Sequence, residues 1–221
     1  MVYDGSTAPG RPALVRELGS VSIRKLAVGS MNNNTYLVTE NGTGAAVLID
    51  AAAQWPAIQT MIGESGSKVE AIVTTHRHAD HTGALAEAVR DLGARTYAGG
   101  PDADHLPVPV DVPLQDGDIL TVGGISLTIA LLRGHTPGSV VLTYTDPGGH
   151  DHVFTGDTLF PGGVGATTHY GYQSFSQLVD DVDSRIFGRH DDAAWVYPGH
   201  GDDTTVGAER PHLAQWRDRG W

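Results

Sequence analysis

The segment 74–83, TTHRHADHTG, constrains this chain more than any other stretch of its sequence. It lies between an apolar run at 68–75 and an amphipathic run at 82–93, so it reads as a loop held at both ends by a strand and a helix. Four polar, metal-competent side chains within six residues are difficult to satisfy in a protein interior without a cation. The candidate ligands in this segment are His76, His78, Asp80 and His81.

The spacing inside this segment indicates that its side chains point in two different directions. His76 and His78 alternate by two, so in an extended segment their side chains point the same way. Asp80 and His81 are adjacent where the chain turns into the helix, so they can aim at a second ion. The alternative interpretation of the segment is a solvated polar loop without a metal.

Further candidate ligands follow three other apolar runs, at 125–132, 152–156 and 194–198. Each is a lone polar residue beside a glycine, which permits a tight turn and a close approach of the backbone. Taken singly, such a residue is typical of a turn. Taken with the first segment, the three supply the missing nitrogen and oxygen donors: His135, Asp157 and His200.

The rest of the chain reads as strands with a few interspersed helices, which predicts sheets covered by helices. Strand-length apolar runs lie at 21–28, 34–40, 45–50, 68–75, 125–132, 139–145, 152–156 and 194–199. Helical spacing is found at 56–63, 82–93, 208–218 and after the capping box of Ser174 and Gln177. No linker separates two domains, so we expect a single domain over 1–221 with a loose N-terminal arm over 1–20.

Composition excludes several classes of protein. The 221 residues contain no cysteine, which rules out disulfides, thiolate metal sites and a cysteine nucleophile. A net charge of −12 argues against nucleic acid and anionic lipid as partners and leaves a small-molecule substrate. No apolar run is long enough to cross a membrane, and the first residues do not resemble a secretory signal, so we expect a cytoplasmic protein. The oligomeric state stays open.

These motifs resemble the metallo-β-lactamase-fold hydrolases, specifically their glyoxalase II-like (hydroxyacylglutathione hydrolase-like) branch. NTYLV at 34–38 and VLIDA at 47–51 look like the family's early strands, and Asp50 takes the place of its buried aspartate behind the ligands. The resemblance extends to about His200. It implies an α/β (α+β) fold, a four-layer αββα sandwich with the metals at one edge.

The resemblance also implies two divalent metal ions, with Zn²⁺ expected and Fe or Mn as alternatives that suit imidazole and carboxylate ligands equally. Such a pair can share a hydroxide, lower its pKa towards neutrality and direct it at an acyl carbon. Asp80 would also be catalytic, as a proton carrier for the leaving group. The implied first-metal ligands are His76, His78 and His135, the bridge is Asp157, and the second-metal ligands are Asp80, His81 and His200.

The substrate is less constrained. Glyoxalase II enzymes carry a basic residue shortly after the bridging aspartate, and here Ala166 stands about where it would be. The loop 160–173 offers His169, Tyr170 and Tyr172 as candidate substrate contacts instead, although a surface loop with ordinary aromatic residues is an equal alternative.

We therefore expect a hydrolase of a thioester or related small acyl substrate, attacked by a metal-bound hydroxide. One alternative is a mononuclear iron persulfide dioxygenase, in which Asp80, His81 and His200 would be structural. Others are a lactonase-type hydrolase and a non-catalytic member that keeps metal for folding alone. A full set of seven ligands favours the first over a one-metal enzyme.

Overall fold

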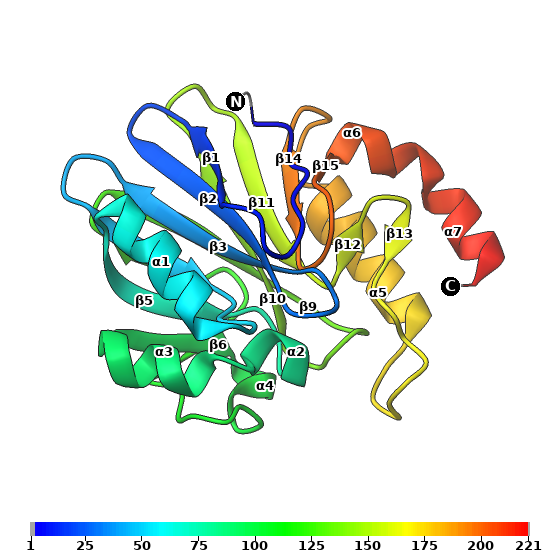
Figure 1. Ribbon diagram of the computed structural model, residues 1–221. Coiled ribbons are helices and arrows are strands. Elements are labelled where there is room, and N and C mark those ends of the chain that lie inside the picture. Colours follow the sequence, from blue (N-terminus) through cyan, green and yellow to red (C-terminus); the bar gives the residue numbers. More distant parts are fainter. Residues whose placement is uncertain (1–2, 221) are drawn as a thin grey trace.

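Two β-sheets stack face to face in the computed structural model, which describes residues 3–220 (Figure 1). In the first sheet β1 to β4 are antiparallel neighbours and β4 to β7 are parallel neighbours. Its strands, in spatial order, are β1 (Leu14–Glu17), β2 (Val21–Val28), β3 (Asn33–Glu40), β4 (Ala45–Ile49), β5 (Lys68–Thr74), β6 (Arg95–Gly99) and β7 (Val112–Leu114).

The second sheet has the spatial order β15-β14-β11-β10-β9-β8, in which only the β11–β14 pairing is parallel. Its strands are β8 (Ile119–Val122), β9 (Ile125–Leu132), β10 (Ser139–Thr145), β11 (Asp151–Gly156), β14 (Trp195–Pro198) and β15 (Thr204–Thr205). A separate two-stranded ribbon pairs β12 (Leu159–Phe160) with β13 (Gly163–Val164).

Helices cover both outer faces of the stacked sheets (Figure 1). On the first sheet lie α1 (Trp55–Ser65) and α3 (Leu85–Leu92), with the short α2 (Ala79–Thr82) and α4 (Gly100–Ala103) near its edge. On the second lie α5 (Phe175–Val182), its π-helical continuation (Asp183–Phe187), α6 (Val206–Glu209), a 3₁₀ turn (Arg210–His212) and α7 (Leu213–Arg219). The expected four layers, helix, sheet, sheet and helix, are confirmed.

Strand β4 is apolar along its whole length because both of its faces are buried. In β4, Val47 and Ile49 face the second sheet, whereas Ala46 and Leu48 pack against the helices. Successive side chains of a strand point to opposite faces, so one strand supplies both core layers. This explains why the sequence of β4 is a continuous apolar run rather than an alternating one.

The helix expected over 82–93 is divided into α2 and α3. A β-carbon at Gly83 would lie 2.7 Å from the carbonyl oxygen of Ala52, so the backbone passes too close to its neighbour for a side chain. The expected end of this helix is confirmed at Gly93, which has φ of +60° and donates its N–H to the Val89 carbonyl.

The expectation of a loose N-terminal arm is wrong for its described part, whereas Met1 and Val2 lie outside the described residues. β1 pairs with β2, and Gly5 and Thr7 are buried. The physical reason is the fully buried Lys25, whose ammonium donates a hydrogen bond to the Gly5 carbonyl (2.7 Å). A buried cation needs acceptors on every side, and the arm supplies one of them.

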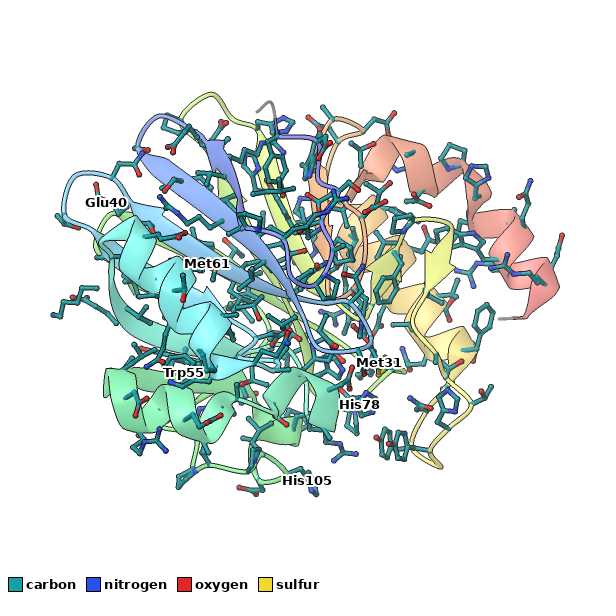
Figure 2. The ribbon with its side chains drawn as sticks, in the orientation of Figure 1. Met31, Glu40, Trp55, Met61, His78 and His105 are labelled. Carbon is teal, nitrogen blue, oxygen red and sulfur yellow. The ribbon has the colours of Figure 1, made fainter. Side chains whose placement is uncertain are left out.

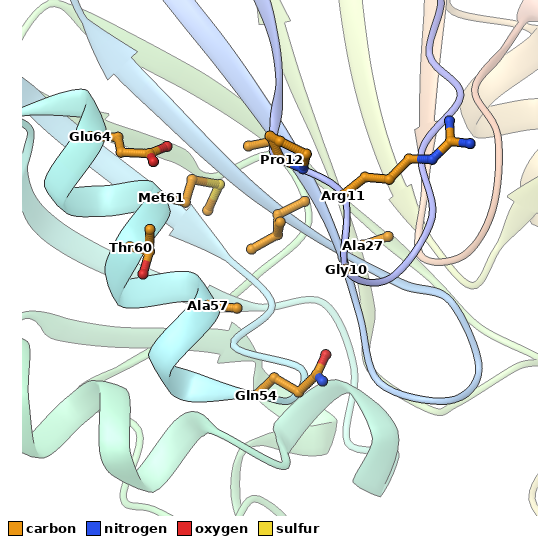
Figure 3. A pocket seen from close by; sticks show the side chains of 11 residues that line it. Gly10, Arg11, Pro12, Ala27, Gln54, Ala57, Thr60, Met61 and Glu64 are labelled. Carbon is orange, nitrogen blue, oxygen red and sulfur yellow. The ribbon is translucent and has the colours of Figure 1, made fainter.

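The arm also forms one wall of a pocket of about 350 Å³ opposite α1 (Figure 3). Leu26, Ala57 and Met61 contribute apolar lining, and none of the candidate metal ligands reaches this pocket. Across residues 3–220, no helix is both long enough and apolar enough to cross a lipid bilayer.

Candidate metal centre

All four ligand-bearing segments follow the carboxyl ends of strands. The 74–83 segment follows β5, His135 follows β9, Asp157 follows β11 and His200 follows β14. Because β11 and β14 are parallel, their carboxyl ends meet at the same edge of the second sheet. The end of β5 is tied to this edge by the N–H of Val140, which donates to the Thr75 carbonyl (2.8 Å).

The structure brings all seven predicted ligands together. Their nitrogen and oxygen atoms form three groups, within each of which the ligand atoms lie within 4.8 Å of one another. The groups share His76 and His81, so they form one continuous centre. Their members are His76, His78 and His135; His76, His81 and Asp157; and Asp80, His81 and His200.

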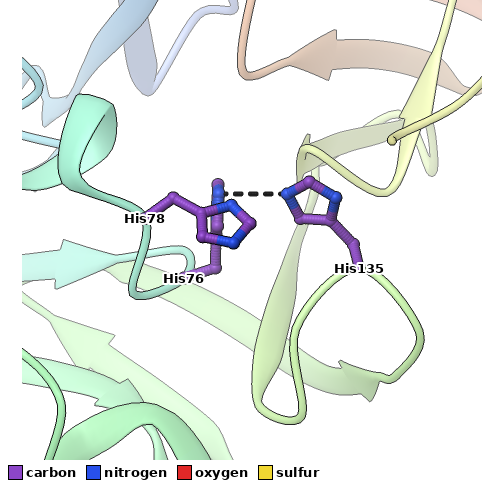
Figure 4. Close-up of side chains that lie close together, drawn as sticks. All are labelled: His76, His78 and His135. Atoms are coloured by element: carbon purple, nitrogen blue, oxygen red, sulfur yellow. Dashed lines mark hydrogen bonds between the residues drawn. The ribbon is translucent and has the colours of Figure 1, made fainter. Parts of the chain in front are cut away.

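In the first group, the Nε2 atoms of His76 and His135 face each other (Figure 4). The Nδ1 atom of His135 donates to the Ala166 carbonyl (2.8 Å), which leaves its Nε2 with a lone pair. In His76, Nδ1 lies 3.1 Å from the Thr75 hydroxyl, whose proton is already donated to Asp50, so His76 Nδ1 is the donor there. The two Nε2 lone pairs are therefore 3.3 Å apart, an arrangement that a cation stabilises.

The same arrangement recurs in the Asp80 group. His81 donates from Nδ1 to Asp50 Oδ2 (2.8 Å), and His200 donates from Nδ1 to the Met31 carbonyl (3.0 Å). Their Nε2 atoms then face each other at 3.1 Å. The carboxylate of Asp80 approaches from the side, with Oδ2 3.2 Å from His200 Nε2.

Asp157 lies between the two pairs, in the position expected of a bridge. Its Oδ2 atom is 3.6 Å from His135 Nε2 and 3.4 Å from His200 Nε2. Its Oδ1 atom is buried and accepts no well-aligned hydrogen bond, and the nitrogen beside it is His81 Nε2, 3.2 Å away. A buried carboxylate oxygen without a donor is costly, and a metal ion removes that cost.

The backbone leaves space for this carboxylate at Gly199. A β-carbon there would overlap Asp157 Oδ1 and lie 2.7 Å from His81 Cε1. Glycine at this position is therefore required by the packing of the ligands themselves.

The pKa values of His76 and His78, in the first group, differ from that of His200, in the Asp80 group. Burial lowers the pKa of His76, and it lowers the pKa of His78 to about 4, so these imidazoles are neutral and able to coordinate. Burial also opposes protonation of His200, but hydrogen bonds to Asp157 and Asp80 outweigh it and raise the pKa to about 10. The carboxylates around this pair thus attract positive charge. The donor set and its charge fit two divalent cations.

Two supporting residues carry no sequence signal of their own. Asn33 donates from Nδ2 to both the carbonyl (3.1 Å) and Oδ2 (2.9 Å) of Asp80. Asp102, fully buried, accepts from the N–H groups of Arg77 (3.2 Å) and Gly138 (3.0 Å), and so fixes two ligand-bearing turns to each other. Asp50, by contrast, was expected behind the ligands and is found there, in contact with His81.

Two of the three candidate substrate contacts lie beside the metal ligands. The rings of Tyr170 and Tyr172 are stacked, 5.2 Å apart and within 6° of parallel, and Tyr170 stacks on His78 at 5.1 Å. The Tyr172 hydroxyl lies 2.9 Å from His78 Nε2, so with Nε2–H as donor the Nδ1 lone pair of His78 remains for a metal. His169 contributes its backbone N–H, donated to Gln173 Oε1 (2.8 Å).

The rim of the centre is aromatic and apolar. Met31 is 61% exposed and lies at the same end of the molecule as His78 (Figure 2). The guanidinium of Arg77 lies over the Tyr172 ring, 4.2 Å from its centre, with Nε 3.7 Å from Asp102. This cation is thus engaged by the protein itself, and Ala166 adds no charge.

Comparison with known proteins agrees with the fold and the cluster of metal ligands described above. A family model described as the metallo-beta-lactamase superfamily matches residues 28–200. An uncharacterized protein of Mycobacterium tuberculosis is 31% identical over 207 residues, which cover 82% of this chain and 92% of that protein. A hydroxyacylglutathione hydrolase of Anaeromyxobacter dehalogenans is 34% identical over 169 residues, or 76% of this chain. The match spans 61% of the length of that hydrolase.

Among solved structures, the protein TTHA1623 in a di-iron-bound form is similar throughout. It superposes with a TM-score of 0.71 at 31% sequence identity, covering 84% of this chain and 96% of that one.

Proposed function

The chain belongs to the metallo-beta-lactamase superfamily, as a metallo-hydrolase with a histidine-rich metal site, and from that premise we propose that it hydrolyses a thioester or related small acyl substrate. We further propose that it does so with two divalent metal ions, Zn²⁺ being the first choice and iron or manganese the alternatives. The seven ligands would divide as expected, with Asp157 between the ions.

One observation carries the two-metal proposal. Two separate pairs of imidazoles, His76 with His135 and His81 with His200, direct their Nε2 atoms at each other on either side of Asp157. A single ion would relieve one pair and leave the other. The di-iron form of the similar protein TTHA1623 supports the same number of ions.

The metal pair, when bound, would lower the pKa of a water molecule and polarise the acyl carbonyl. Side chains of the protein orient the metal ligands and carry the proton. Asp50 keeps His81 in one tautomer, and Asn33 holds the Asp80 carboxylate towards the centre. The side chain of Asp80 is 29% exposed against 12% for Asp157, so Asp80 is the better placed of the two to pass a proton to a leaving group.

The rim favours a substrate whose recognition does not depend on carboxylates. Tyr170 and Tyr172 offer a flat aromatic surface, whereas Ala166 offers no cation to a charged thiol carrier. We propose that these two tyrosines contact the substrate and that glutathione thioesters are hydrolysed less well than thioesters of uncharged thiols.

The test combines metal content with two assays on the purified protein. We expect about two zinc ions per chain, hydrolysis of a thioester, and no oxygen uptake with a thiol persulfide. One iron per chain with oxygen consumption would instead identify a persulfide dioxygenase. Hydrolysis of lactones but not of thioesters would move the activity to the lactonase type, and metal without either activity would indicate a structural role.

A further inference from the structure

The side-chain amide of Gln173 uses its full hydrogen-bonding capacity at the edge of the metal centre. Its Oε1 accepts from the N–H groups of His169 (2.8 Å) and Tyr170 (3.1 Å). Its Nε2 donates to the carbonyls of His135 (3.0 Å) and Ala166 (3.0 Å). A carboxamide has two N–H donors and an oxygen with two lone pairs, so each is matched here.

The donating half of this amide acts on a candidate metal ligand. The Ala166 carbonyl that accepts from Gln173 also accepts from His135 Nδ1 (2.8 Å). That second bond fixes the tautomer and the ring orientation of His135 and directs its Nε2 towards His76. Gln173 therefore holds both the backbone of His135 and the carbonyl against which its ring rests.

The accepting half acts on the aromatic rim. Its two bonds close the turn 169–173, which is also closed by the Gln173 N–H donating to the Tyr170 carbonyl (3.0 Å). Within this turn the rings of Tyr170 and Tyr172 stack on each other and reach His78. One amide thus connects two ligands of the first group to the surface that faces substrate.

We propose that Gln173 is a positioning residue that couples the aromatic rim to the His76, His78 and His135 group. It would set metal affinity through His135 and substrate affinity through the two tyrosines. Its effect on catalysis rests on the proposed function, whereas its effect on metal affinity rests on the ligand geometry alone. Loss of partners behind a metal ligand typically weakens metal binding by about 10–100-fold.

Two variants separate the halves of the amide. Gln173→Glu keeps an oxygen for the N–H groups of the turn but places a second oxygen against the carbonyls of His135 and Ala166. Gln173→Met keeps the length of the side chain and removes both halves. Gln59→Met is the matched control, because Gln59 is exposed on α1 and its amide reaches only Asp91 (3.3 Å).

Zinc affinity is measured by competition with a chromophoric chelator, and kcat and KM with an acyl thioester. We expect Gln173→Glu to weaken one zinc site by about 10–100-fold and lower kcat with a smaller change in KM. Gln173→Met should weaken zinc and also raise KM, while Gln59→Met changes neither. Circular dichroism establishes that each variant is folded; if Gln173→Glu is not, Gln173→Met alone decides the metal affinity.

The proposal is overturned if folded Gln173 variants bind both zinc ions as the parent protein does and differ only in melting temperature. If the parent protein binds zinc but cleaves no thioester, the proposed function fails while the chelator measurement still decides the role of Gln173. Conversely, if the parent protein is an active hydrolase and the Gln173 variants bind zinc with unchanged affinity, Gln173 has no positioning role and the proposed function still stands.

Discussion

Two buried polar clusters of this protein differ in the balance of their hydrogen-bond donors and acceptors. In the Lys25 cluster, made of Tyr3, Lys25, Trp195 and Asp203, every group has a partner. Asp203 Oδ1 accepts from Lys25 Nζ (2.6 Å), and Oδ2 accepts from the Tyr3 hydroxyl (2.7 Å) and Trp195 Nε1 (2.8 Å). In the metal centre, by contrast, the Nε2 atoms of His76 and His135 face each other as two acceptors. The first cluster is complete as it stands, and the second requires cations.

Although every donor and acceptor of the Lys25 cluster is paired, the cluster is not for that reason a source of stability. Burial raises the pKa of Asp203 and lowers that of Lys25, and each partner offsets only part of the shift in the other. Its value is positional: Lys25 Nζ donates to the Gly201 carbonyl (2.6 Å), to which Asn34 Nδ2 also donates (2.9 Å). The turn that presents His200 is therefore held by the complete cluster.

The largest effect is expected from Asp157→Ala, which removes the carboxylate between the imidazole pairs. We expect loss of at least one metal ion per chain and a fall in hydrolysis of about 10³-fold or more, because both of the proposed ions would share this residue. Metal analysis and thioester kinetics measure the two effects, with Asp104→Ala on the surface as the control. Full metal content together with full activity would show that Asp157 is not a ligand.

Breaking the complete cluster should act on stability. Lys25→Met leaves the Asp203 carboxylate buried without its cation, and we expect it to lower the free energy of unfolding by about 3–5 kcal/mol in a urea titration. The double variant Lys25→Met, Asp203→Leu should recover only part of this loss, because no unpaired charge remains but the Tyr3 hydroxyl and Trp195 Nε1 lose their acceptor. A loss below about 1 kcal/mol for the single variant would contradict the description of the cluster.

Gly199→Ala tests how tightly the ligands are packed. The added β-carbon would overlap Asp157 Oδ1, so we expect a destabilisation of about 1–3 kcal/mol and weaker metal binding. The control is Gly63→Ala on α1, where a β-carbon meets nothing within 4 Å and should stabilise the helix by about 0.5–1 kcal/mol. Equal behaviour of the two variants in metal binding and unfolding would disprove the steric argument.

The smallest effect is expected from Tyr3→Phe, which removes one of the three donors to Asp203. We expect a loss of about 1 kcal/mol in the free energy of unfolding, since two donors remain. Zinc stoichiometry should not change. A loss of metal in this variant would mean that the N-terminal arm, and not only Lys25, determines the position of His200.

The candidate ligands could be found from the sequence because each follows an apolar run at a glycine-flanked turn. The same pattern located most strands that supply both core layers. The short strands β6, β7 and β8 are not predicted, because strands of three to five residues carry too little apolar pattern. The docking of the arm is not predicted for another reason: the hydrogen bonds that hold Tyr3 and Gly5 in place are made to Lys25 and Asp203, which are distant in the chain.

The sequence by itself determined which chemistry is available: five histidines and two aspartates at strand ends, no cysteine, and no basic residue at position 166. Only the tertiary structure decided which nitrogen of each imidazole is free. That choice depends on acceptors distant in the chain, such as the Met31 carbonyl, 169 residues from His200. It also assigned roles to Asn33, Asp102 and Gln173, whose hydrogen bonds exist only after the sheet edges have met.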